Sequence, residues 1–111
     1  MTEQTQGQQG SIYRIDKFKV PAAARAEFLA TLNETKEFLA RQAGCRQNLV
    51  LEVQSGSERF NVLTLVEWDS RAAFEAAGAA MIENRKSTGF NPQAFLGRLG
   101  VEADMANYTT I

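Results

Sequence analysis

The stretch FNVLTLVEW, residues 60–68, predicts a strand whose two faces are both apolar. Successive side chains of a strand point to opposite sides of its sheet, so one face carries Val66 and Trp68 while the other carries Leu63 and Leu65. Each apolar face needs a covering layer. The helices that the chain can supply suffice for one face, and the other face therefore predicts association with a second copy of the protein.

The composition narrows the classes of function before any motif is considered. The 111 residues include 12 basic and 13 acidic side chains without a basic block, so nucleic acid is not an expected partner. Histidine is absent, which removes the commonest general base, the usual haem ligand and the nitrogen ligand of most zinc sites. The single cysteine, Cys45, cannot replace it in a metal cluster. We expect no metal and no cofactor.

The length indicates one domain, which buries roughly two-thirds of its unfolded surface without disulfides or a structural metal. Cys45 has no partner for an internal disulfide, and no charged start leads into an apolar run of signal-peptide or membrane-spanning length. We therefore expect a cytoplasmic protein with no membrane partner. Residues 1–10, MTEQTQGQQG, have no apolar period and are expected to form a disordered leader, which leaves residues 11–111 as the domain.

Hydrophobic periodicity, caps and turn residues divide the domain into alternating elements. In chain order these are a strand at 11–20, a helix at 21–43, a strand at 46–54, a turn at 55–58, the strand at 60–68, a helix capped by Asp69 and Ser70, a short helix opened by Asn91 and Pro92, and an extended segment at 101–111. The apolar side chains change parity midway along the first strand, which suggests a bulge near Asp16 and Lys17. The order predicts an α+β domain of the ferredoxin-like, split βαβ type, with a four-stranded antiparallel sheet that carries its helices on one face.

Three short motifs in this layout resemble the antibiotic biosynthesis monooxygenase (ABM) family of dimeric α/β barrels. They are FKVPAAARAEFLATL at residues 18–32, QAGC at 42–45 and VLTLVEWDSRAAFEAA at 62–77, and the resemblance covers nearly everything after residue 11. It implies that two chains pair their bare sheet faces into a barrel, and that each chain keeps a pocket between its own sheet and helices. The activities it implies are cofactor-independent oxygenation of polycyclic quinol-type substrates, haem degradation, and isomerase-like chemistry on small signalling molecules. The fold does not choose among them.

Departures from the family's pattern bear on these activities. Haem-degrading relatives bind iron through a histidine near the position of Gly78, so haem breakdown is not expected here. Quinol-oxygenating relatives use an asparagine four residues before the tryptophan and a tyrosine six residues after it, where this chain has Thr64 and Phe74. Two of the hydrogen-bonding groups that the resemblance implies are therefore altered or lost.

Three residues are candidates for a catalytic role. Trp68 offers a flat surface and an indole N–H to a planar phenol, although a tryptophan at a strand end also suits a packed core. Arg85 lies on the same helical stripe as Phe74, so its guanidinium either holds an enolate, phenolate or carboxylate or extends to solvent from the last turn of the helix. Thr64 has a hydroxyl among apolar neighbours, where it either orients a substrate oxygen or serves only as a good strand former.

Further candidates would contact the ligand without reacting. They are the strand amides Asn48 and Asn61, which supply donors unless they face solvent, and the apolar walls Phe74, Met81, Phe90 and Phe95. From these residues we predict a cofactor-independent monooxygenase that acts on a small aromatic or quinol-type substrate. The alternative is a homodimer that binds a small apolar ligand without converting it, because a pocket with few donors binds more readily than it catalyses.

Overall fold

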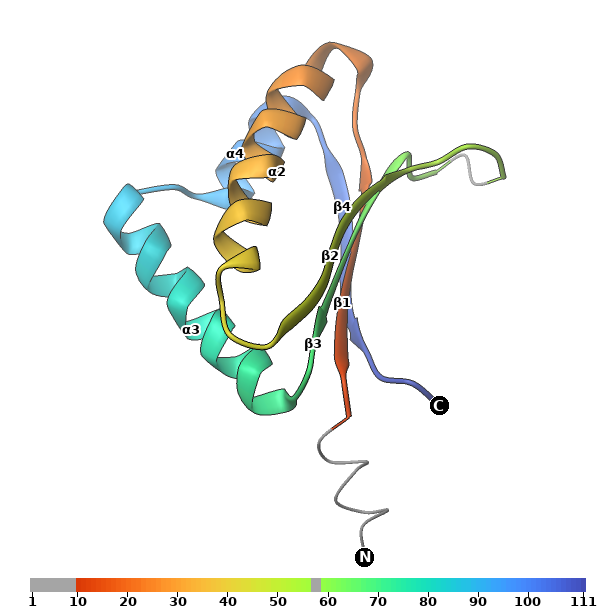
Figure 1. Ribbon diagram of the computed structural model, residues 1–111. Helices are drawn as coiled ribbons and strands as arrows, with labels where there is room; N and C mark the ends of the chain where they lie inside the picture. Colours follow the sequence, from red (N-terminus) through yellow and green to blue (C-terminus); the bar gives the residue numbers. More distant parts are fainter. Residues whose placement is uncertain (1–9, 57–58) are drawn as a thin grey trace, which may run out of the picture.

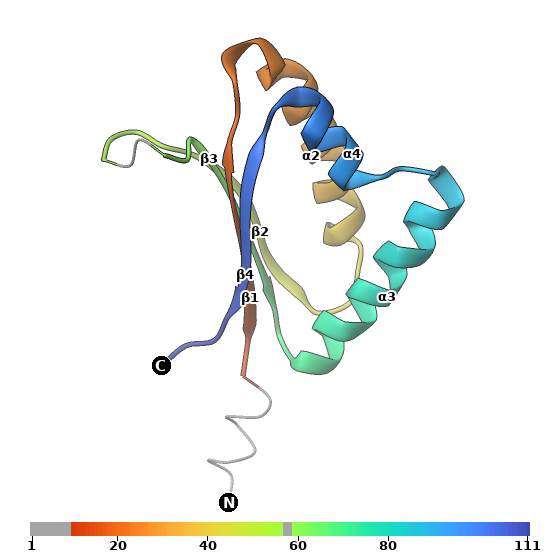
Figure 2. The same cartoon turned by 180° about the vertical axis from the view of Figure 1, so that it is seen from behind.

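A four-stranded antiparallel sheet carries all of its helices on one side (Figures 1 and 2) in the computed structural model, which describes residues 10–56 and 59–111. The elements in chain order are β1 (Ile12–Lys19), the 3-10 helix η1 (Ala22–Ala24), α2 (Arg25–Ala40), β2 (Cys45–Glu52), β3 (Val62–Trp68), α3 (Arg71–Thr88), α4 (Pro92–Leu99) and β4 (Glu102–Tyr108). The α+β, ferredoxin-like prediction is confirmed. Residues 1–9 of the expected leader and residues 57–58 of the expected turn lie outside the described ranges.

The sheet has the strand order β2-β3-β1-β4, so the two-faced strand predicted at 60–68 lies inside the sheet as β3. Alternation along β3 separates its side chains as expected: Val66 and Trp68 are buried beneath the helices, and Leu63 and Leu65 face the uncovered side. The uncovered side keeps its apolar character on β2, where Leu49 is 41% exposed.

The bulge predicted near Asp16 and Lys17 is wrong. From Ile12 to Phe18, β1 pairs residue by residue with β3, and the register shift of the sheet lies in β2 between Cys45 and Gln47. The parity change has a different cause, because both faces of β1 are apolar at different positions along the strand. One consequence is that Asp16 shares the helix-facing side with Phe18.

Capping residues begin α3 and α4 where the sequence places them. The Ser70 side chain accepts a hydrogen bond from the Ala73 amide at 3.1 Å, and Asn91 does the same for Ala94 at 3.0 Å. The first helix is shorter than the predicted 21–43 at both ends. A 3-10 turn capped by Pro21 precedes α2, and α2 ends at Ala40, before the predicted end at 43. Gly44, at φ 87°, follows α2, and a β-carbon there would lie 2.5 Å from that of Ala73. Only glycine fits this close approach.

The helix-facing core consists of two separate clusters. The larger one surrounds Phe28, which is 2% exposed and meets the Phe18 ring edge to face at 5.0 Å. The smaller one joins Val66, Trp68 and Ala77 near the start of α3. The described helices include none that is long and apolar enough to cross a membrane. From its start beside β3, α3 runs away from the sheet (Figure 1).

Candidate functional site

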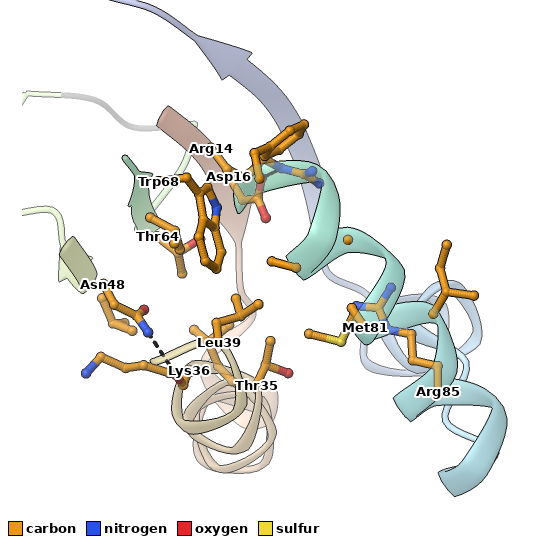
Figure 3. A pocket seen from close by; sticks show the side chains of 17 residues that line it. Arg14, Asp16, Thr35, Lys36, Leu39, Asn48, Thr64, Trp68, Met81 and Arg85 are labelled. Atoms are coloured by element: carbon orange, nitrogen blue, oxygen red, sulfur yellow. Dashed lines mark hydrogen bonds and ion pairs between the residues drawn. The ribbon is translucent and has the colours of Figure 1, made fainter. Parts of the chain in front are cut away.

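A cavity of about 270 Å³ occupies the space between the two core clusters (Figure 3). The sheet forms one wall and α2 and α3 form the other. Its lining residues are Arg14, Asp16, Leu32, Thr35, Lys36, Leu39, Asn48, Val50, Thr64, Val66, Trp68, Phe74, Ala77, Gly78, Met81, Ile82 and Arg85. The volume lies just below the roughly 300–1,000 Å³ of typical ligand pockets, and mostly apolar walls with a few polar groups are the usual composition of such sites.

Trp68 supplies the cavity's flat aromatic surface. The residue is 3% exposed, and its indole N–H donates to no protein group in the part of the chain that the structure describes. No fully buried side-chain nitrogen or oxygen of those residues lacks a partner. Trp68 lines the cavity, and Figure 3 shows its indole extending into that space, where the N–H can donate a hydrogen bond to a ligand oxygen.

Thr64 lies at the centre of the sheet wall. It is 9% exposed, and its neighbours across the strands are Val50 on β2 and Asp16 on β1. Its hydroxyl makes no hydrogen bond within the described ranges, and the residue lines the cavity. Thr64 and Trp68 share the helix-facing side of β3, so the structure brings two of the three candidate catalytic residues to one wall.

An ion pair that the sequence analysis missed lies beside Thr64. The Arg14 Nε donates to Asp16 Oδ1 at 2.6 Å, and the Asp16 side chain is 18% exposed. Burial raises the pKa of Asp16, and the hydrogen bond and charge of Arg14 lower it without cancelling the effect of burial. Strand parity was the signal that could have found the pair, because without a bulge Arg14 and Asp16 fall on the same face as Phe18.

Arg85 enters the cavity from α3 and is half-buried. Its pKa is lowered by burial and, to a smaller extent, by the charge of Arg14. It belongs to no ion pair among residues 10–56 and 59–111. A second hollow of about 460 Å³ between α2 and α3 also includes Arg85, which therefore lies where the two spaces meet. Its guanidinium is a cation available to an anionic ligand.

The remaining predicted ligand contacts divide between the cavity and other places. Phe74 and Met81 line the cavity, and so does Asn48, whose Nδ2 donates to the Lys36 carbonyl at 2.8 Å. Asn61 does not line it: its Oδ1 accepts from the Val20 amide and its Nδ2 donates to the Val20 carbonyl, both at 2.9 Å. This amide replaces a missing rung of the β1–β3 ladder.

Phe90 and Phe95 also lie outside the main cavity. Phe90 lines the second hollow, and the ring centroids of Phe90 and Phe95 are 5.4 Å apart. Phe95 stacks on Phe28 at 6.5 Å, as part of the larger core cluster. The sequence pattern predicted that these rings would be apolar walls, but it could not show whether each ring lines the cavity, the second hollow or the core.

The cavity does not fit an iron-bound haem. Gly78 lines it without a side chain, and a β-carbon there would meet nothing within 4 Å. The walls hold no imidazole, thiolate or phenolate, and the thioether of Met81 is a haem ligand that proteins pair with a histidine. Among the described residues there is also no group of three side chains suited to hold a metal ion.

Comparison with known proteins adds a family and a fold. A family model described as antibiotic biosynthesis monooxygenase matches residues 11–80. A candidate monooxygenase from Shewanella loihica PV-4 has a TM-score of 0.69 at 22% identity, covering 92% of this chain and 95% of its own. SnoaB, a cofactor-independent oxygenase from Streptomyces nogalater, has a TM-score of 0.66 at 24% identity, and the match covers 92% of this chain and 94% of SnoaB.

A third solved structure, the haem-degrading protein Rv3592 from Mycobacterium tuberculosis, gives a TM-score of 0.54 at 22% identity, covering 61% of this chain and 77% of its own. At such identities the likeness shows a shared fold and leaves activity open. No curated protein matches the sequence.

Proposed function

We propose that this chain, which belongs to the antibiotic biosynthesis monooxygenase family, is a cofactor-independent monooxygenase that acts on a small aromatic or quinol-type substrate. The observation that carries the proposal is the content of one cavity. The free indole N–H of Trp68 and the cation of Arg85 open into the same apolar space, in a chain that has no histidine. These groups suit a flat ligand that becomes an anion.

The reaction class follows from what such a cavity can and cannot supply. A substrate such as an anthrone, once deprotonated, passes an electron to O₂, and the recombined peroxide loses water. The net change converts a CH₂ group and O₂ into a carbonyl and H₂O. The chain contributes by excluding water, packing the ring against Trp68 and holding the negative charge near Arg85.

Half-burial strengthens the contribution of Arg85. A guanidinium that is partly withdrawn from water attracts an anion more strongly than one on the surface, because less solvent screens the interaction. Since the cation has no protein carboxylate to satisfy among the described residues, its charge is available to the ligand. Lys36 also lines the cavity, but its ammonium points away from the centre (Figure 3).

We also propose that the protein is a homodimer formed through the uncovered sheet face, and that it works in the cytoplasm. Leu49, Leu65, Ile15 and Ala106 form one continuous row across the four strands on that face. The Glu67 carboxylate on the same face already accepts a hydrogen bond from Gln47 Nε2 at 2.7 Å, so its burial would not leave it without a partner. A twin sheet would remove this apolar row from water.

Oxygen uptake by the purified protein tests the monooxygenase proposal. A panel of hydroquinones and anthrones should include at least one compound that consumes O₂ faster than buffer alone. Arg85→Gln should lower kcat by about 10²- to 10³-fold, the usual cost of removing one group that stabilises a developing anion. Arg71→Gln, an exposed arginine of α3 outside the cavity, should leave the rate unchanged. Uptake no faster than buffer for every compound would contradict the proposal.

One observation favours the alternative of a non-catalytic ligand-binding protein. Phe74 lines the cavity at the position where quinol-oxygenating relatives carry a tyrosine, so the cavity has one donor fewer than the resemblance implies. Under this alternative, the same compounds should quench Trp68 fluorescence without any O₂ uptake. Turnover that depends on Arg85 would exclude it.

A further inference from the structure

We propose that Asp16 is the catalytic residue that takes the proton from the substrate, and that Arg14 is the positioning residue that holds its carboxylate in place. The inference rests on the proposed function, because it names the base that the oxygenation requires. It concerns a strand β1 pair that the family resemblance did not indicate and that only the register of the sheet brings to the cavity.

Elimination within the cavity leaves Asp16 as the proton acceptor. The charged side chains of the lining are Arg14 on β1, Asp16 on β1, Lys36 on α2 and Arg85 on α3, while β2 and β3 contribute none. Arginine and lysine hold their protons at neutral pH, and the threonine and asparagine of the lining are not bases. Histidine, the commonest general base, is absent from the chain.

The geometry leaves one oxygen of Asp16 ready to react. Oδ1 accepts from Arg14 Nε at 2.6 Å, while Oδ2 has no donor in the part of the chain that the structure describes. Arg14 is itself fixed from a second side, since its Nη2 lies 3.3 Å from the Met105 sulfur on β4. Figure 3 shows Arg14 and Asp16 on the sheet wall at the edge of the cavity, with Trp68 and Thr64 on the same wall.

Two opposing influences on Asp16 suit it to this role. A carboxylate with its ordinary pKa is a weak base at neutral pH, and burial raises the pKa of Asp16. The hydrogen bond and charge of Arg14 oppose that rise, because they favour the ionised form. Met105 on β4 and Thr64 on β3, its neighbours across the strands, carry no charge that would alter this balance.

The proposed steps balance in protons and electrons. Asp16 Oδ2 forms a bond to the acidic hydrogen of the substrate, the C–H bond breaks, and its electron pair stays on the substrate as an anion. O₂ takes up one electron from that anion, and recombination of the two radicals forms a C–O bond to a peroxide anion. Asp16 returns its proton to the peroxide, which then loses water to leave the carbonyl. The carboxylate is regenerated, and O₂ is the oxidant throughout.

Deuterium exchange without oxygen tests the base separately from the oxygenation. Anthrone is incubated in D₂O under anaerobic conditions, and incorporation of deuterium at its CH₂ group is followed by NMR. The wild-type protein should accelerate the exchange over buffer. In Asp16→Asn the protein-catalysed exchange rate should fall by about 10²- to 10⁴-fold, the typical contribution of a general base. Glu83→Gln, an exposed carboxylate of α3 outside the cavity, should behave as the wild type.

Each outcome separates the two proposals. Equal exchange by the wild type and Asp16→Asn overturns the assignment of Asp16, even where oxygen uptake is intact. A second outcome is that the wild type accelerates exchange, Asp16→Asn does not, and the wild type consumes no O₂. This result supports Asp16 as the base and contradicts the monooxygenase. No acceleration by the wild type overturns the assignment as well.

Arg14→Gln provides a second readout that does not depend on the folding of Asp16→Asn. Because Arg14 lowers the pKa of Asp16, its removal should let that pKa rise further. The acid limb of the exchange rate against pH should then move to higher pH, and Arg14→Lys should move it back towards the wild type. An unchanged profile would show that Arg14 does not act through Asp16.

Discussion

Asp16 is a charged residue in a place that suits an apolar one. It lies on the helix-facing side of a central strand, next to Phe18 and Thr64, where packing alone would favour an apolar side chain. Its only described charge partner is Arg14, whose side chain is 38% exposed and therefore partly screened by water. A carboxylate kept under these conditions lowers the stability of the fold, and that cost can be measured.

The pH dependence of unfolding should reveal the cost. The folded-state pKa of Asp16 is higher than that of the unfolded chain, so the group favours the fold when protonated and opposes it once pH rises through the folded-state pKa. Asp16→Asn cannot ionise. We expect it to unfold at a higher temperature than the wild type at pH 7, with a difference that shrinks towards pH 4. Differential scanning calorimetry checks this, and a lower Tm for Asp16→Asn at pH 7 would contradict it.

Helix α3 determines the size of the cavity. It begins at Arg71, directly after the N-cap Ser70 at the end of β3, and diverges from the sheet (Figure 1). Its small residues Ala77 and Gly78 line the cavity. Gly78 has no contact within 4 Å of the place where a β-carbon would be. A larger side chain at this position would therefore grow into the cavity instead of into packed protein.

Gly78→Leu should fill the cavity while keeping the fold. Leucine is preferred over glycine in a helix by about 0.8 kcal/mol, so we expect the variant to be at least as stable as the wild type. Affinity for the panel compounds, measured by quenching of Trp68 fluorescence, should fall at least about tenfold, which corresponds to about 1.4 kcal/mol. Gly97→Leu on α4 is the matched control, since Gly97 is equally unobstructed and lies outside the cavity. Unchanged affinity in Gly78→Leu would place the ligand elsewhere.

The elements could be predicted from the sequence because their signals are local. Ser70 and Asn91 cap α3 and α4, and two-faced apolarity marks β3. Gly44 was a misleading end signal, because the first helix already ends at Ala40. The site was predictable only in part, because it depends on register. The positions of Trp68 and Thr64 follow from alternation along β3. Asp16 was not predicted as a site residue, because the sequence suggested a bulge that β1 does not have. Asn61 could not be assigned either, since its partner Val20 is 41 residues away in the chain.

The molecule as a whole has one covered and one bare sheet face. Among the described apolar residues, Leu51 is 46% exposed, Leu49 41% and Val53 39%, and all three lie along the same strand or its continuation. Exposed apolar side chains that are adjacent in space mark an interaction surface, unlike single ones scattered over a protein. The proposed dimer would explain why this face is apolar in a chain of only 111 residues.

A charge on the bare face should separate the dimer. In Leu49→Glu, a two-fold axis would bring a carboxylate from each chain into an apolar contact, which is unfavourable for both. Sedimentation of the wild type should give a mass of twice 12.3 kDa and that of the variant 12.3 kDa. Ala76→Glu, on the exposed side of α3, should remain dimeric. A wild type that sediments at 12.3 kDa at micromolar concentration would refute the dimer.

Isotopic labelling of the product tests the central claim most directly. The metal-free protein is given anthrone under ¹⁸O₂ in ordinary water, and the anthraquinone formed above the buffer rate is analysed by mass spectrometry. Direct oxygenation in the cavity predicts that the new carbonyl carries one atom of ¹⁸O, since its oxygen comes from the peroxide. Product with only ¹⁶O in that carbonyl, or no product above the buffer rate, would contradict a cofactor-independent monooxygenase.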